Sequence, residues 1–179
     1  MPYRHGEVSA TGCCRGWPVT TLYTGMGQGK MFQGATSLSL DAKGRMAVPA
    51  RHRDALAALA GGRLVLTAHP HQCLLLYPEN AWVPIRDRIL AAPSFDPRSA
   101  ATKRVLLGNA LDVSLDAAGR LLITPELREV AALEKQVWLV GMGSHFEVWS
   151  DAGWKRQHEA AFEALSSTEP PPGFEDFSL

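Results

Sequence analysis

The chain has 179 residues, of which 46% are hydrophobic, and its 18 basic residues balance its 18 acidic residues to a formal net charge of zero. This composition can bury a real core, and the zero net charge argues against a protein that coats nucleic acid or membranes by overall electrostatic attraction. Because no apolar run approaches the roughly 18 residues of a membrane helix and no signal peptide is recognisable, we expect a cytoplasmic protein without a membrane partner.

The first 30 residues differ from the rest of the chain. They contain six glycines and no sustained hydrophobic period, so we expect a disordered leader over residues 1–30. Patterned sequence starts abruptly at Met31, which makes Met31 a candidate for the natural start. The adjacent Cys13 and Cys14 lack the further ligands of a metal site, and the three cysteines of the chain give no disulfide framework.

The first patterned half predicts strands, a helix, a strand pair and two further helices. Alternating apolar residues, prolines and glycine pairs give the bounds. We expect two strands within 35–48 around a turn, a helix over 50–59, strands at 64–67 and 73–77, and helices from 78 to about 90 and from 97 to about 107.

The second half repeats this order, with three residues fewer, most simply missing opposite Ala60-Gly61-Gly62. A unit of about forty residues buries little core alone, so we expect the two repeats, over 31–96 and 97–165, to pack together. The acidic, proline-rich end over 166–179 is expected to be a flexible tail. The second repeat is predicted to contain strands at 112–115, 121–123, 137–140 and 146–149, a turn at Gly141-Met142-Gly143, and helices from 125 to about 133 and from about 151 to 165.

One turn occurs twice, as Leu40-Asp41-Ala42-Lys43-Gly44-Arg45 and as Leu115-Asp116-Ala117-Ala118-Gly119-Arg120. Asp can cap such a turn, Gly can take the positive φ, and Arg emerges beside them. A fixed arginine can bind the O6 and N7 atoms of guanine, or two phosphate oxygens, with both arms of its guanidinium group. For a single copy, a tight hairpin with an ordinary surface ion pair is the better explanation. The repetition favours a shared function.

Local charge separates the two turns. Residues 41–63 hold five basic and two acidic residues, a balance of +3, whereas residues 112–136 hold three basic and five acidic residues, a balance of −2. Because phosphate neutralisation supplies much of the affinity for DNA, we expect the first copy to make most of any DNA contact, with Arg51 and Arg53 adding phosphate contacts. The second copy would then mainly support the fold.

Other functional signals are weaker. His69, His71 and Cys73 alternate as metal ligands could, but the equivalent positions in the second repeat do not match, so a turn is the better explanation. No nucleophile has a His and an acid at useful spacing, and no glycine-rich phosphate loop occurs. We therefore expect no catalysis, no cofactor and no metal, and we assign Trp82, Trp149 and Trp154 to the core or to a subunit interface.

The residues that carry a family resemblance are Met31-Phe32-Gln33-Gly34-Ala35-Thr36, the two D-x-x-x-R turns, Val48-Pro49, and Pro125-Glu126-Leu127-Arg128-Glu129. In these residues the chain resembles the MraZ family, which is similar to the AbrB and SpoVT proteins. The resemblance implies an α+β, mainly β fold in which two tandem AbrB-like swapped-hairpin repeats form one pseudo-symmetric barrel with flanking helices.

The resemblance also implies a function. A MraZ-like chain is expected to be a nucleoid-associated transcriptional regulator of the division and cell-wall gene cluster, to bind short promoter repeats in double-stranded DNA, and to assemble into a homo-oligomeric ring. The DNA-contacting motif corresponds to Asp41, Lys43 and Arg45, and the second copy of the motif corresponds to Asp116 and Arg120. Two alternatives stay open: an antitoxin-type protein-interaction module, and a small barrel that binds an anionic metabolite.

Overall fold

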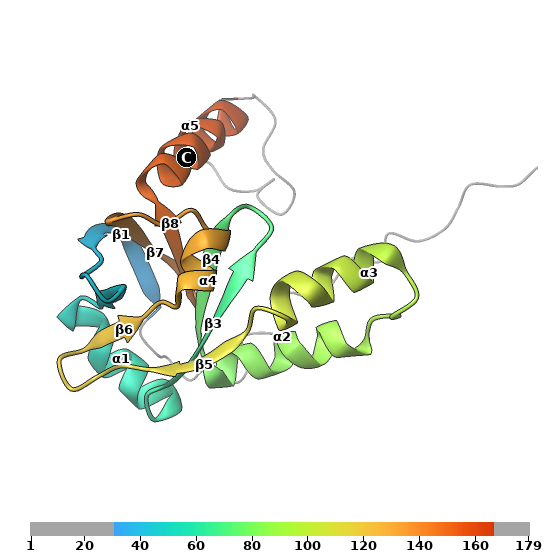
Figure 1. The fold of residues 1–179 in the computed structure, drawn as a ribbon, viewed down its shortest axis with the longest axis horizontal. Coiled ribbons are helices and arrows are strands. Elements are labelled where there is room, and N and C mark those ends of the chain that lie inside the picture. Colours follow the sequence, from blue (N-terminus) through green and yellow to red (C-terminus); the bar gives the residue numbers. More distant parts are fainter. Residues whose placement is uncertain (1–30, 167–179) are drawn as a thin grey trace, which may run out of the picture.

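The computed structural model describes residues 31–166 of the chain (Figure 1). The predictions for the leader, for Cys13 and Cys14, and for the tail beyond residue 166 lie outside the described residues.

Each repeat contains strand, strand, helix, strand, strand and helix, in the predicted order. The first repeat consists of β1 (Phe32–Ser39), β2 (Arg45–Ala47), α1 (Ala50–Ala60), β3 (Arg63–His69), β4 (Cys73–Pro78) and α2 (Glu79–Ala91). It is followed by α3 (Pro97–Thr102) and, directly after it, the π-helical segment η2 (Lys103–Leu107). The second repeat consists of β5 (Leu111–Ser114), β6 (Arg120–Leu122), α4 (Pro125–Val130), β7 (Gln136–Gly143), β8 (Phe146–Ser150) and α5 (Asp151–Leu165).

Two predicted boundaries in the second repeat were wrong. Helix α4 ends at Val130 rather than near residue 133, because Ala132 adopts a positive φ of 48° that a helix cannot contain. Strand β7 continues through the expected turn at 141–143. A Cβ atom on Gly141 would lie 2.5 Å from the backbone nitrogen of Gln33, so this glycine allows β1 to approach closely and does not form a turn.

The eight strands form two antiparallel sheets. The larger sheet has the order β1-β7-β8-β4-β3-β5, and the smaller one is the two-stranded pair β2-β6. The order of the larger sheet is the same from both ends when β1 is matched with β5, β3 with β7 and β4 with β8. The two repeats are therefore related by a pseudo-twofold axis.

The strands on either side of each repeated turn pair with the other repeat. β1 pairs with β7, β5 with β3, and β2 with β6, so the expected two-stranded hairpin around Asp41 is reduced to a single bridge between Leu40 and Met46. Met46 and Leu121, which are equivalent in the two repeats, face each other directly. The sequence predicted two packed repeats, and the structure shows that they exchange strands.

The strand register also corrects the position of the length difference between the repeats. Leu38 pairs with Val137, and Val113 pairs with Leu64. Since Leu38 and Val113 are equivalent, Leu64 is equivalent to Val137. Two of the three extra residues therefore precede β3, near the end of α1, and the third lies in the turn between β3 and β4.

The core lies on both faces of the larger sheet. One cluster contains the inward side chains of β2 and β6 together with residues of α1 and α4, including the fully buried Met46, Leu56 and Leu121. The other cluster lies under α2, η2 and α5 and contains Trp82 and Trp149, which confirms the core assignment of these two residues. Helices α2 and α3 project to the right in Figure 1, while α1 and β6 lie to the left.

The expected barrel is not confirmed. The six-stranded sheet does not close, and β1 and β5 are its two edges. The structure is a mixed α and β fold that is organised by strands and built from two exchanged repeats.

Candidate functional site

The first repeated turn, residues 41–45, is held together by Asp41. We call it turn 1. One carboxylate oxygen of Asp41, Oδ1, accepts hydrogen bonds from the backbone nitrogens of Lys43 and Arg45, each at 2.9 Å. The other oxygen, Oδ2, accepts Nε of Arg45 at 2.8 Å and one of its terminal nitrogens at 2.7 Å. Asp41 therefore shapes the turn and sets the direction of the arginine.

The second turn, residues 116–120 or turn 2, has the same geometry. Asp116 Oδ1 accepts the backbone nitrogens of Ala118 and Arg120 at 2.9 Å, and Asp116 Oδ2 accepts Arg120 Nε at 2.8 Å. The sequence predicted that Asp caps the turn, and the structure shows that each aspartate also pairs with the arginine of its own turn.

The pKa values of Asp41 and Asp116 are both lowered, and for the same reasons. Hydrogen bonds from the backbone nitrogens of Arg45 and Arg120 are the largest cause that lowers the pKa of Asp41 and Asp116, and the paired arginine side chains add to it. Both carboxylates are therefore charged at neutral pH and keep their arginines paired.

Each turn is fastened to the opposite repeat. Gly44 and Gly119 adopt φ values of 77° and 72°, which favour glycine. The carbonyl oxygen of Gly44 accepts the backbone nitrogen of Ile123, and that of Gly119 accepts the backbone nitrogen of Val48, both at 3.0 Å. The position of each turn therefore depends on the strand that follows the other turn.

The pair β2-β6, which we call the ribbon, brings the two turn arginines to one face. Met46 and Leu121 are buried, so alternation along the strands puts their neighbours on the outer side. In the register, Arg45 lies opposite Leu122 and Arg120 lies opposite Ala47. The arginines thus occupy diagonal corners of the exposed face, and their side chains are 28% and 37% exposed.

The structure separates Arg51 and Arg53 from turn 1. Arg51 reaches over β1, where its terminal nitrogen donates to the Thr36 hydroxyl at 2.6 Å. Arg53 donates through Nε to the carbonyl oxygen of Val48 at 2.7 Å and packs against Gly119 of turn 2. Arg51 remains exposed, whereas Arg53 is half-buried.

Sequence reasoning missed Arg128. It is the counterpart of Arg53, and its guanidinium group packs against Gly44 of turn 1, where an added Cβ atom would lie 3.0 Å from Cζ. The signal was present in the sequence, since Arg53 and Arg128 lie at equivalent distances after the two turns. Strand exchange therefore places Arg128, from the acidic residues 112–136, beside turn 1, and Arg53, from the basic residues 41–63, beside turn 2. The charge count along the chain could not show this.

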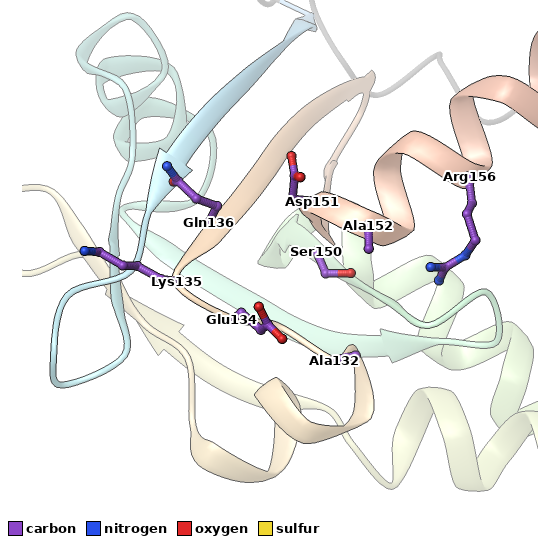
Figure 2. A pocket seen from close by; sticks show the side chains of 8 residues that line it. All are labelled: Ala132, Glu134, Lys135, Gln136, Ser150, Asp151, Ala152 and Arg156. Atoms are coloured by element: carbon purple, nitrogen blue, oxygen red, sulfur yellow. The ribbon is translucent and has the colours of Figure 1, made fainter.

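A polar hollow lies between the start of α5 and the connection from α4 to β7 (Figure 2). Asp151 is on its rim and is occupied by two hydrogen bonds, from Trp138 Nε1 at 3.0 Å and from Lys155 Nζ at 2.7 Å. Glu134, Lys135 and Arg156 also line it. Charges of both signs surround the hollow, and they do not form an acid, base and nucleophile set.

The histidines near the β3–β4 turn do not form a metal site with Cys73. Burial raises the pKa of the Cys73 thiol to about 12, so the thiol stays protonated. Within residues 31–166, no three His, Cys, Asp or Glu side chains are grouped in a way that could hold a metal ion. None of the helices in this described part is long and apolar enough to span a membrane.

Comparisons with known proteins match both repeats. The model of the family named MraZ protein, described as antitoxin-like, matches residues 31–105 and again residues 106–172. The chain is 66% identical over 149 residues to the transcriptional regulator MraZ of Dechloromonas aromatica, and 64% identical over 149 residues to that of Aromatoleum aromaticum. It is 60% identical over the same length to that of Methylobacillus flagellatus. Each alignment covers 83% of this chain and all of the relative.

Proposed function

Because the chain belongs to the MraZ family, we propose that it is a transcriptional regulator, not an enzyme, and that it binds double-stranded DNA in a sequence-specific way through the ribbon and its two turns. The family model covers both repeats, and the relatives of that name align over their whole length.

The observation that carries this proposal is the shared exposed face of Arg45 and Arg120. A two-stranded antiparallel ribbon is narrow enough to enter the major groove of DNA, where arginine can bind guanine with both arms of its guanidinium group. Asp41 and Asp116 each fix the direction of the arginine in their own turn before the protein contacts DNA. This preorganisation lowers the entropy that the side chains lose on binding.

The two turns are proposed to differ in their contribution. Turn 1 carries the exposed Lys43, whereas turn 2 has Ala118 at the equivalent position. We therefore assign base reading mainly to Arg45, with Lys43 on a nearby phosphate. Arg120 is assigned a second, weaker contact. Arg51 is exposed and can reach a phosphate beside β1, while Arg53 supports turn 2 through its contact with Gly119.

The finer parts of the function follow from the family resemblance. We propose that the target is the promoter of the division and cell-wall gene cluster and that the chain acts in the cytoplasm on the nucleoid. The two repeats of each chain are proposed to form one pseudo-symmetric barrel, and copies of the chain to assemble into a ring. Assembly is supported by exposed apolar side chains at the tip of the α2–α3 pair and near the end of α5, namely Leu90, Phe95, Phe162 and Leu165. A neutral chain gains affinity for DNA when several copies bind together.

Titration of the full chain against the promoter upstream of its own gene tests the proposal. The variants are Arg45→Ala, Arg45→Lys, and Arg86→Ala on α2 as a control that removes one cation far from the ribbon. Loss of one bidentate contact costs roughly 1–3 kcal/mol, or about 5- to 150-fold in affinity for each site. Arg45→Lys should lose nearly as much, since lysine keeps the charge but cannot make the bidentate contact.

Two outcomes would contradict the proposal. The proposed mechanism is wrong if the wild-type chain binds promoter and scrambled DNA equally, or if Arg45→Ala binds the promoter as tightly as wild type. Equal binding of both DNAs would favour the antitoxin-type module or the metabolite-binding barrel instead.

A further inference from the structure

We propose that turn 1 carries a phosphate-binding cradle built from both repeats, in which Arg128 and Lys135 of the second repeat hold a backbone phosphate of the bound DNA. The inference rests on the proposed function, and it assigns to DNA contact two residues of the repeat whose charge along the sequence is acidic.

The first observation concerns Arg128. Its guanidinium group lies against Gly44, and its Nε atom is buried with no hydrogen-bond partner among the described residues. The equivalent atom of Arg53 donates to the Val48 carbonyl oxygen at 2.7 Å. Without this bond to the main chain, the guanidinium group of Arg128 is held less firmly than that of Arg53 and can turn toward an acceptor in the neighbouring hollow. A phosphate oxygen is such an acceptor.

The second observation is the hollow beside Arg128. It lies between turn 1 and the connection from α4 to β7, and it is lined by Leu40, Asp41, Ala42, Arg128 and Lys135 together with Leu133 and Glu134. The connection is fixed there because the carbonyl oxygen of Lys135 accepts the backbone nitrogen of Leu40 at 2.8 Å. The hollow is thus a fixed feature of the boundary between the repeats.

The third observation is the direction of the side chains on this connection. In Figure 2, Lys135 points toward the connection between β1 and α1, while the carboxylate of Glu134 points to the other side, toward Ser150 and Arg156. Lys135 is exposed. Glu134 and Lys135 both line the two hollows, but the ammonium group of Lys135 lies on the side of turn 1 and the carboxylate of Glu134 is directed away from it.

Turn 2 lacks an equivalent cradle. The strand register makes Gly61 and Gly62 the counterparts of Glu134 and Lys135, so a glycine takes the position that Lys135 has beside turn 1. Arg53, the counterpart of Arg128, is already hydrogen-bonded through Nε. The two turns share one internal geometry. Beside turn 2, Arg53 is bonded to Val48 and Arg63, which lies opposite Ser114, is paired with Glu79, so these two cations of the first repeat already have partners.

The first test is the salt dependence of promoter binding. Each phosphate contact contributes about −0.9 to the slope of log K against log salt. Lys135→Gln should make this slope shallower by about 0.9 for each bound chain while the preference for promoter over scrambled DNA stays as in wild type. Arg86→Gln removes the same charge from α2 and should leave the slope unchanged. An unchanged slope in Lys135→Gln overturns the cradle, whereas loss of specificity in Arg45→Ala in the same experiment leaves the proposed function standing.

The second test uses inorganic phosphate and the NMR signal of the Arg128 Nε–H group. At constant ionic strength, phosphate should shift this signal in the wild-type chain, and the shift should be weaker in Lys135→Gln. Phosphate should also shift the signal of the Ala42 amide, because Ala42 lines the same hollow. Arg128→Lys, with its fold checked by thermal unfolding, should lose this second shift. One outcome is that the wild-type chain binds promoter and scrambled DNA equally while phosphate still shifts the Arg128 Nε–H signal. The proposed function and the assignment of the cradle to DNA are then both wrong, and the ligand is a small phosphate compound. If phosphate shifts nothing, the cradle itself is overturned.

Discussion

Replacing Gly119 by alanine tests the strand exchange and the role of Arg53 together. Alanine at a φ of 72° costs roughly 1–2 kcal/mol from left-handed backbone strain, and Gly44→Ala at 77° carries the same cost. At Gly119, however, the new Cβ atom would overlap Nε of Arg53 and lie 2.5 Å from its Cδ and Cζ atoms. Arg53 must then move and lose its bond to Val48, which adds about 1.5–3 kcal/mol.

The measurement is urea unfolding of wild type, Gly44→Ala, Gly119→Ala, Arg53→Ala and the double variant Gly119→Ala/Arg53→Ala. Gly119→Ala should lower the free energy of unfolding by about 2.5–5 kcal/mol. Gly44→Ala should cost little more than the strain of about 1–2 kcal/mol, because the new Cβ atom would lie 3.0 Å from Arg128 and 3.1 Å from the Ile123 carbonyl oxygen and would not overlap either. Without Arg53, Gly119→Ala should cost only the strain. Equal losses in both glycine variants, or strict additivity in the double variant, would refute the contact between Arg53 and turn 2.

Three further results are expected. Gly141→Ala should destabilise the fold by more than about 2 kcal/mol in urea unfolding, because its Cβ atom would lie 2.5 Å from the Gln33 nitrogen in β1; Gly62→Ala, with open space around it, should cost only strain, and equal losses would contradict this reading. Asp41→Asn should weaken the preference for promoter over scrambled DNA in a binding titration, because Arg45 loses its charged partner, whereas Asp96→Asn at the start of α3 should not. Burial lowers the pKa of His52, His69 and His145, so protons bind the unfolded chain more strongly; stability is then complete above about pH 6.5 and falls as the pH drops below it. A second loss follows below about pH 4 as Asp41 and Asp116 are protonated. Unfolding midpoints at pH 7.5 and 5.5 check the first loss, which should shrink in His52→Gln and is disproved by equal midpoints.

Local sequence signals predicted most of the elements and the internal shape of the turns. Asp, Gly and Arg at fixed spacing determine the hydrogen bonds around Asp41 because all of these contacts lie within five residues. The prolines and glycines at the helix ends likewise predicted the positions of α1 and α2. The prediction of a turn at Gly141 was wrong because a glycine that permits close approach of strands looks the same in sequence as a glycine that makes a turn.

Long-range pairing could not be predicted in the same way. Whether β2 pairs with β1 or with β6 depends on contacts between residues more than seventy positions apart, and alternation of apolar residues is the same in both cases. For this reason the charge count assigned Arg53 to turn 1 and left Arg128 out, although the structure places them at turn 2 and turn 1 respectively. Because Arg53 and Arg128 are equivalent in the two repeats, assuming strand exchange would have predicted the contact between Arg128 and turn 1.

The strand exchange also determines when the chain can fold. Strands β1 and β2 find their partners only in β7 and β6, so a ribosome that has completed the first repeat has made strands without partners. Unpaired strand edges promote association between chains, and contacts over long sequence separations slow folding. The first repeat must therefore wait for the second during synthesis, and nascent chains on one messenger could exchange strands with each other before each chain closes on itself.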